Sequence, residues 1–135
     1  DGHASALPGH VLAMESDNGA FNPKGYIFTG SDAAADVVKE VAALLDSAGI
    51  SGVQRVPESP AADITPLVAL GIPGMELDND GSRYFWYHHS DGDTLDKIDP
   101  KDLARCVAAM AVMAYVVADL PDPLPHTPST AASGS

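Results

Sequence analysis

The sequence contains a single cysteine, Cys106, among its 135 residues. An intrachain disulfide is therefore impossible, and neither a CxxC redox motif nor a cysteine-based zinc motif can be built. Because Cys106 lies in an apolar stretch, we expect a buried structural thiol rather than a reactive one. The cysteine content thereby excludes a small scaffold held together by disulfides.

Basic residues are also scarce: seven lysines and arginines against 19 acidic residues give a formal net charge of −12. Nucleic-acid binding requires a basic surface, so we expect no nucleic-acid partner, and anionic membrane surfaces are disfavoured for the same reason. The longest uncharged apolar run, Cys106 to Ala118, is shorter than the roughly 20 residues of a membrane-spanning helix. We therefore expect no membrane partner either.

Several well-known chemical motifs are missing. The chain has no GxGxxG, no P-loop and no GxSxG, so dinucleotide binding, nucleotide hydrolysis and the serine chemistry of α/β-hydrolases have no support. Residues 1–4 lack the basic and apolar regions of a signal peptide. If the chain is the tail of a longer precursor, such a signal is expected upstream.

The sequence does contain an alternation of strand-like and helix-like segments. Strands are predicted at residues 10–14, 26–28, 53–56, 75–77 and 84–87, and helices at residues 31–48, 63–70 and 99–120. Ser31, Asp63 and Asp99 are the expected N-caps, and Gly49 is an expected C-terminal stop. This alternation predicts one α/β domain with a largely parallel sheet.

The last predicted helix is apolar nearly all round, which is typical of a helix packed inside a larger body. Three prolines at positions 121, 123 and 125 end it. Residues 121–135 are therefore expected to form a proline-rich, flexible tail.

Polar side chains follow two of the predicted strands. Asp17 comes after the first strand, where α/β sheets gather their ligands, so it is a candidate for holding a cation; a simple turn with the next two residues is the alternative. His88 and His89 follow the aromatic strand and, if extended, point to opposite sides. One of them could then bind a metal while the other faces substrate or solvent, or both could form a surface pair. Asp93 could support a ligand imidazole, or act only as a turn residue.

Six motifs then occur in one order along the chain. They are Met14-Glu15-Ser16-Asp17, Phe28-Thr29-Gly30-Ser31, Asp63-Ile64, Gly71-Ile72-Pro73-Gly74, His88-His89-Ser90-Asp91-Gly92-Asp93-Thr94 and Tyr115-Val116-Val117-Ala118-Asp119-Leu120. From about His10 to Pro125, this series closely resembles the C-terminal part of the plasma glutamate carboxypeptidase (carboxypeptidase Q) family. That family is a branch of the co-catalytic dizinc peptidases, which also contain bacterial aminopeptidases.

The resemblance implies a three-layer fold of the phosphorylase/hydrolase-like type, with a mixed sheet between helices. Residues 1–120 would be the C-terminal portion of a zinc exopeptidase catalytic domain. The family's two zinc ions are held by a His, a bridging Asp, a Glu, a second Asp and a last His, with a further Glu as general base. Asp17 matches the second Asp, and His89 matches the last His because three residues separate it from Asp93-Thr94. His88 stands where related aminopeptidases have a tyrosine that polarises the scissile carbonyl.

The other ligands and the general base belong upstream of Asp17, and residues 1–16 do not supply them. The resemblance therefore implies the C-terminal portion of a zinc-dependent exopeptidase, secreted or periplasmic, that cleaves dipeptides or short peptides with a metal-bound water. Its partners would be the peptide substrate and the missing N-terminal portion, and the chain alone would bind zinc weakly at most. Two alternatives stay open: a non-catalytic remnant that serves binding or assembly, and a metal-binding module that uses Asp17 and His89 across a homodimer.

Overall fold

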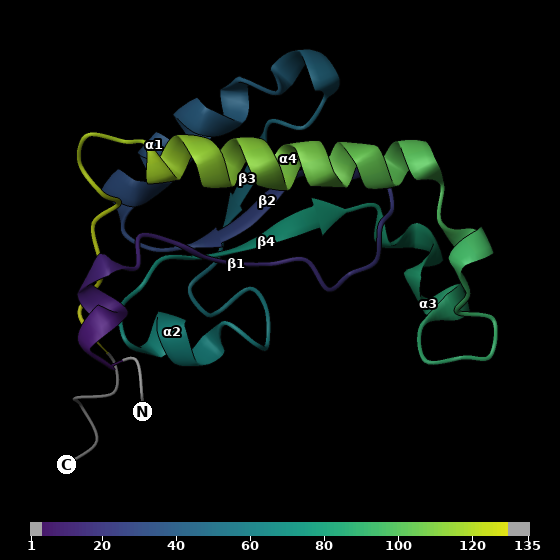
Figure 1. The fold of residues 1–135 in the computed structure, drawn as a ribbon, viewed down its shortest axis with the longest axis horizontal. Coiled ribbons are helices and arrows are strands. Elements are labelled where there is room, and N and C mark those ends of the chain that lie inside the picture. Colours follow the sequence, from purple (N-terminus) through teal and green to yellow (C-terminus); the bar gives the residue numbers. More distant parts are fainter. Residues whose placement is uncertain (1–3, 130–135) are drawn as a thin grey trace.

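The computed structural model describes residues 4–129, which form four strands and four α-helices joined by short 3-10 turns (Figure 1). The strands are β1 (Ala13–Glu15), β2 (Pro23–Thr29), β3 (Gly52–Arg55) and β4 (Gly74–Asn79). The helices are α1 (Asp32–Ala43), α2 (Thr65–Ala69), α3 (Tyr84–Tyr87) and α4 (Pro100–Ala118). Within this described part, no helix combines the length and apolarity needed to cross a membrane.

The four strands make one mixed sheet in the order β1-β4-β2-β3. β1 runs parallel to β4 and β2 runs parallel to β3, whereas β2 and β4 are antiparallel. A mixed α/β fold is therefore confirmed, as the family resemblance implies. The expectation of a largely parallel sheet is wrong for the central pair, because β4 returns beside β2 in the opposite direction.

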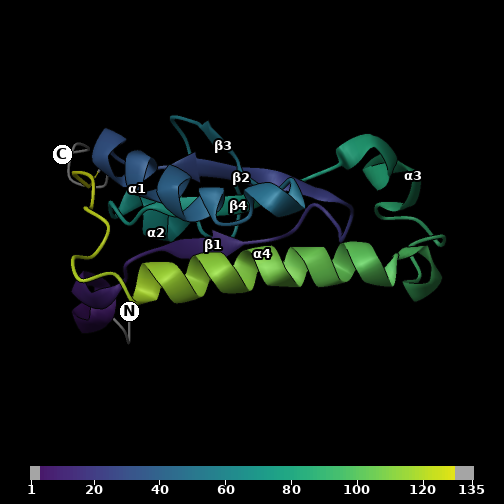
Figure 2. The same cartoon turned by 90° about the horizontal axis from the view of Figure 1, so that it is seen from above.

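Helices α1 and α4 lie over the same face of the sheet, as the view from above shows (Figure 2). Each helix places small or apolar residues at helical spacing toward the sheet: Ala34, Ala35, Val38, Val41 and Ala42 in α1, and Cys106, Ala109, Met113 and Val117 in α4. The sheet contributes alternate residues of β2 and β4 to the same core, including Tyr26, Phe28, Met75 and Leu77. This period-two alternation makes one continuous core on that face.

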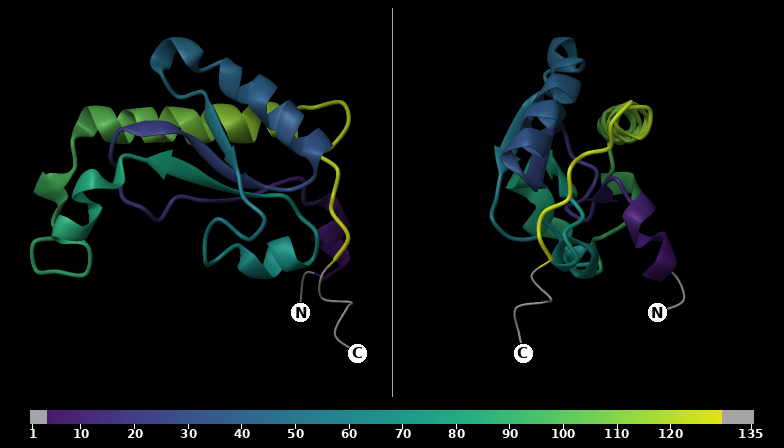
Figure 3. Two further views of the ribbon diagram at one scale, coloured as in Figure 1. Left: turned by 180° about the vertical axis from the view of Figure 1, so that it is seen from behind. Right: turned by 90° about the vertical axis from the view of Figure 1, so that its left-hand side faces the viewer.

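The opposite face of β4 is covered by α2 (Figure 3). Gly74 points away from the main core, and an added Cβ there would meet Val68 at 2.5 Å and Ile64 at 3.3 Å. A glycine is therefore needed for α2 to approach the strand this closely. Helices thus lie on both faces of the sheet.

Several local predictions are confirmed. The Ser31 hydroxyl accepts a hydrogen bond from the Ala34 N–H at 3.1 Å, and the Asp99 carboxylate accepts one from the Lys101 N–H at 2.7 Å. Gly49 is left-handed, with φ of 70°, but it ends the 3-10 turn Asp46–Ala48 rather than α1, which stops at Ala43, so the predicted C-terminal end of that helix is wrong. Strand β3 overlaps the predicted strand at 53–56.

Other local predictions are wrong. β2 begins at Pro23, three residues before the strand predicted at residues 26–28. Asp63 is not the side-chain cap of α2; instead its backbone N–H, like that of Ile64, donates to the Glu15 carboxylate, at 2.9 and 3.3 Å. A distant strand residue therefore holds the segment just before α2, and no side chain caps the helix.

The aromatic run at residues 84–87 is a short helix, not the predicted strand. A continuous aromatic run has no alternation that separates the two conformations. The stacking of Tyr84 on His88, with ring centroids 4.5 Å apart, joins residues four apart, and this contact is available only in a helical turn.

Residues 121–129 contain no helix or strand but are attached to the body of the molecule. Leu124 is 2% exposed and belongs to the main core. The Thr127 N–H donates to the Gly71 carbonyl at 2.9 Å, and His126 Nε2 lies 2.7 Å from the His10 carbonyl. The remainder of the expected tail, residues 130–135, lies outside the described residues.

Candidate active-site cavity

A cavity of about 270 Å³ lies at the carboxyl ends of β1 and β4. One wall comes from the segment after β1, and the other comes from α3 and the loop after it, which lie beyond the tip of β4 in Figure 1. The residues that line it are Asp17, Gly19, Ala20, Phe21, Tyr84, Tyr87, His88, His89, Asp93, Lys97 and Ile98. All three site residues predicted from the sequence, Asp17, His88 and His89, are among them.

The turn that carries Asp17 is held by a buried carboxylate on the neighbouring strand. Glu76 of β4 accepts hydrogen bonds from the Asp17 backbone N–H and from the Asn18 side-chain amide. Gly19 follows with φ of 74° and lets the chain reverse direction. In the part of the chain that the structure describes, no hydrogen bond engages the Asp17 carboxylate itself, which faces the cavity.

The two imidazoles lie together rather than on opposite sides. Their ring centroids are 3.8 Å apart and the ring planes are inclined by only 22°. The expected divergence requires an extended chain, whereas His88 ends α3 and His89 is left-handed with φ of 54°. The reversal of the backbone at His89 therefore brings both rings to the same cavity.

Negative charge is concentrated behind this site. Glu76 is 4% exposed, and its pKa is raised by burial and then by the neighbouring carboxylates of Glu15, Asp17 and Asp78. The hydrogen bond from the Asp17 N–H lowers that pKa only in part. The site therefore has a local negative potential, which favours a cation close to Asp17.

The donor set is incomplete. Among residues 4–129, no group of three or more His, Cys, Asp or Glu side chains is arranged to hold a metal ion. Asp17 and His89 line one cavity as a carboxylate and an imidazole, which are both zinc ligand types. Asp93 lines it too, but within the described residues it makes no hydrogen bond to either imidazole, so its supporting role is still only a prediction.

Sequence reasoning missed two features of the site. The apolar walls formed by Phe21, Tyr84, Tyr87 and Ile98 could not be found, because the helical form of α3 was not predicted. The role of Glu76 was missed because it depends on the pairing of β1 with β4, which no local pattern indicates.

Comparison with known proteins identifies the family. Residues 6–114 match the model of peptidase family M28. The chain belongs to peptidase family M28. It is 41% identical to carboxypeptidase Q of Rattus norvegicus over 125 residues and 39% identical to that of Homo sapiens. The family resemblance drawn from the six motifs is therefore confirmed.

A solved structure agrees with this assignment. The crystal structure of a peptidase M28 precursor from Shewanella amazonensis SB2B superposes with a TM-score of 0.84 at 37% sequence identity, over 94% of this M28 chain and 29% of that chain. The match to rat carboxypeptidase Q covers 93% of this chain but 26% of the relative. The chain thus spans about a quarter of the length of the curated relatives that it matches.

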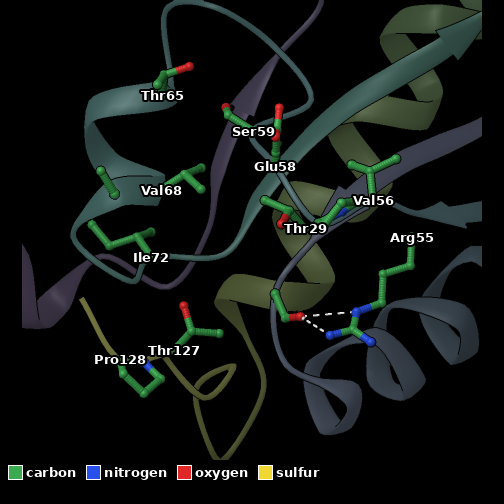
Figure 4. A pocket seen from close by; sticks show the side chains of 13 residues that line it. Thr29, Arg55, Val56, Glu58, Ser59, Thr65, Val68, Ile72, Thr127 and Pro128 are labelled. Carbon is green, nitrogen blue, oxygen red and sulfur yellow. Dashed lines mark hydrogen bonds between the residues drawn. The ribbon is translucent and has the colours of Figure 1, made fainter. Parts of the chain in front are cut away.

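A second cavity, of about 540 Å³, lies at the other end of the sheet, where β2 and β3 end (Figure 4). Arg55 lines it, but its guanidinium already donates twice to the Gly30 carbonyl, at 3.1 and 2.8 Å, and pairs with Asp32. None of the site residues predicted from the sequence lies there, so the cavity at Asp17 is the candidate active site.

Proposed function

We propose that this M28 chain supplies one part of the active site of a zinc-dependent metallo-exopeptidase, of carboxypeptidase, dipeptidase or aminopeptidase type, that hydrolyses short peptides. The observation that carries the proposal is that Asp17 and His89, which are 72 residues apart in sequence, line one cavity in a chain of a peptidase family. In the proposal Asp17 and His89 are metal ligands, and His88 contacts the substrate.

The side chains present are suited to zinc. A carboxylate oxygen and an imidazole nitrogen are among its preferred donors, and a bound cation would offset the repulsion that the carboxylates around Glu76 exert on one another. Two donors are fewer than the three protein ligands usual in a catalytic zinc site. The remaining ligands, the second zinc ion's site and the general base are assigned to the portion of the protein that this chain does not span.

Zinc, when bound, supplies Lewis acidity that lowers the pKa of water and polarises a carbonyl group. The contribution of His88 is a hydrogen bond to the oxyanion that develops on the scissile carbonyl, and a well-placed donor of this kind contributes about 3–4 kcal/mol. The walls formed by Phe21, Tyr84 and Tyr87 exclude water and hold the apolar parts of the substrate.

The resemblance to secreted members of the family also supports a location outside the cytoplasm, in the secretory route or the periplasm. Under this proposal the substrate is a dipeptide or short peptide. The other partner is the portion of the catalytic domain that carries the upstream ligands.

Zinc titration of the chain tests the ligand assignment. After dialysis against a chelator, calorimetry is expected to show that Asp17→Ala and His89→Ala each weaken zinc binding by about tenfold or more. His126→Ala is the matched control, because its ring lies beside His10 and outside the cavity. Equal zinc affinity in the parent chain and all three variants would rule out a metal site at Asp17 and His89.

Peptide hydrolysis tests the division of the active site. The isolated chain is expected to be inactive, and activity is expected when the upstream portion is present in the same protein. In that longer protein, His88→Ala is expected to lower kcat by about a hundredfold with little effect on zinc affinity. A longer protein that binds zinc at Asp17 and His89 but cleaves no peptide would instead support a binding or assembly role.

A further inference from the structure

The buried carboxylate of Glu76 has no function in the proposed reaction, although it contacts the segment that carries Asp17. We propose that Glu76 is a positioning residue: it fixes the turn after β1 so that the Asp17 carboxylate is held toward the cavity. This inference rests on the proposed function, in which Asp17 is a metal ligand.

The strand pairing puts Glu76 in the required place. Glu76 is in register with Glu15 on the parallel neighbour β1, and the pairing of these two strands ends there. Met75 and Leu77, on either side of Glu76, point into the main core, so Glu76 points to the other face. It is 4% exposed, and its contact with the Asn18 side-chain amide places its carboxylate beside the chain as it leaves β1.

The contacts are made to two consecutive residues of the turn. The Asp17 backbone N–H and the Asn18 side-chain amide both donate to Glu76. The hydrogen bonds between β1 and β4 end at Glu15. Beyond that point, the bonds to Glu76 hold the chain beside β4 in their place. An acceptor oxygen at this position therefore holds a short irregular segment that the strand ladder no longer reaches.

The neighbouring carboxylate cannot take over this role. Glu15 lies on the same face of the sheet, but its carboxylate already accepts hydrogen bonds from the backbone N–H groups of Asp63 and Ile64. One carboxylate therefore anchors the start of α2, and the other anchors the turn of Asp17. Removing Glu76 leaves the Asp17 N–H and the Asn18 amide without their acceptor.

Two substitutions of similar length separate positioning from electrostatic attraction. Glu76→Gln removes the charge but keeps an acceptor oxygen, whereas Glu76→Met removes both. If Glu76 acts by positioning, Gln retains the behaviour of the parent chain and Met does not. If it acts only by attracting the cation, or as a ligand itself, both variants weaken zinc binding equally.

The experiment uses the 135-residue chain and Zn²⁺ alone, with two readouts: calorimetric zinc affinity, and hydrogen exchange of the Asp17 amide measured by NMR without metal. For Glu76→Met we expect about tenfold weaker zinc binding and about tenfold faster exchange at Asp17. Glu76→Gln is expected to stay within about twofold of the parent chain in exchange at Asp17, and to lose clearly less zinc affinity than Glu76→Met because it loses only the charge and keeps the acceptor. Asn18→Ala, which keeps Glu76, is expected to shift both readouts in the direction of Met by a smaller amount.

Unchanged exchange at Asp17 in Glu76→Met, or equal loss of zinc affinity in the Gln and Met variants, overturns the inference. Failure of the proposed function looks different: the parent chain then binds no zinc, or binds it equally well as Asp17→Ala, while Glu76→Met still accelerates exchange at Asp17. Should the Met variant fail to fold, Asn18→Ala decides, and exchange at Asp17 equal to that of the parent chain overturns the inference.

Discussion

Three neighbouring carboxylates near the end of β1 have different roles although their chemistry is the same. Glu15 accepts two backbone N–H groups at the start of α2, Glu76 accepts two donors from the turn, and Asp17 faces the cavity. Their surroundings decide the difference, because a buried carboxylate must be satisfied by donors whereas one at a cavity remains available to a ligand. At the residue scale, burial and partners therefore decide what a side chain can do.

Tyr26 gives a prediction at this scale. It is 1% exposed, its hydroxyl donates to the Ala109 carbonyl at 2.9 Å, and burial raises its pKa from 10.0 to about 12. Its contribution to stability is therefore complete below about pH 10 and is lost as pH rises through about 12, because only the unfolded state ionises readily in that window. Denaturant unfolding at a series of alkaline pH values is expected to show this loss.

Tyr26→Phe is expected to lower the free energy of unfolding near neutral pH by about 1 kcal/mol, through loss of the hydrogen bond. The same variant should lack the Tyr26 part of the alkaline decline. Tyr115→Phe is the control, because Tyr115 is 73% exposed. This substitution is expected to change neither the free energy of unfolding near neutral pH nor the alkaline decline. An identical alkaline decline in the Tyr26→Phe and parent chains would show that other groups cause it.

Cys106 gives a second prediction. Burial, followed by the nearby Asp102 carboxylate, raises the pKa of its thiol, and its Sγ lies 3.2 Å from the Phe21 carbonyl. Since the thiolate is the reactive form, the native chain is expected to resist thiol-modifying reagents at neutral pH and to react fully in denaturant. Native and denatured rates of similar size would contradict this.

At the scale of the elements, local chemistry explains where the long helices begin. Ser31 and Asp99 cap α1 and α4 with their own side chains, and Pro100 occupies the first turn of α4. These ends were predictable because a cap and its helix are adjacent in sequence. By contrast, α3 was predicted as a strand, because its aromatic run favours either conformation until the ring contact with His88 selects the helix.

The cap of α4 can be tested directly. Asp99→Ala removes the carboxylate that accepts from the Lys101 N–H, and is expected to lower the free energy of unfolding by about 1 kcal/mol. Asp122→Ala removes an equal charge at an exposed position outside any helix or strand, and is expected to be nearly neutral. Urea unfolding of the two variants measures the difference, and equal effects would mean that net charge rather than capping is responsible.

At the scale of the whole molecule, the C-terminal segment completes the core. Leu124 packs into the cluster that α1, α4 and the sheet form, and Thr127 is bonded to Gly71 at the start of the segment leading into β4. An added Cβ at Gly71 would lie 2.1 Å from the Thr127 carbonyl oxygen. The side of α4 that faces away from the core is apolar and exposed: Leu103 is 41% exposed, Val107 is 59% exposed and Tyr115 is 73% exposed.

The role of this segment predicts a large effect from a residue that lies beyond the last helix. Leu124→Ala is expected to lower the free energy of unfolding by about 2–5 kcal/mol, because it leaves a cavity in the main core. Leu95→Ala makes the same change at a side chain that is 82% exposed, and is expected to cost little. Denaturant unfolding measures both, and a neutral Leu124→Ala would show that the segment is not part of the cooperative core.

Local patterns along the chain predicted an α/β fold, the N-terminal caps of both long helices, the family and the three candidate site residues. All of these depend on nearest neighbours along the chain or on short motifs. Such patterns could not predict that β4 lies between β1 and β2, that His88 and His89 stack on one side, or that Glu76 contacts the turn of Asp17. These features depend on contacts between residues far apart in sequence and on one left-handed backbone, and their free energy arises only when the sheet has assembled.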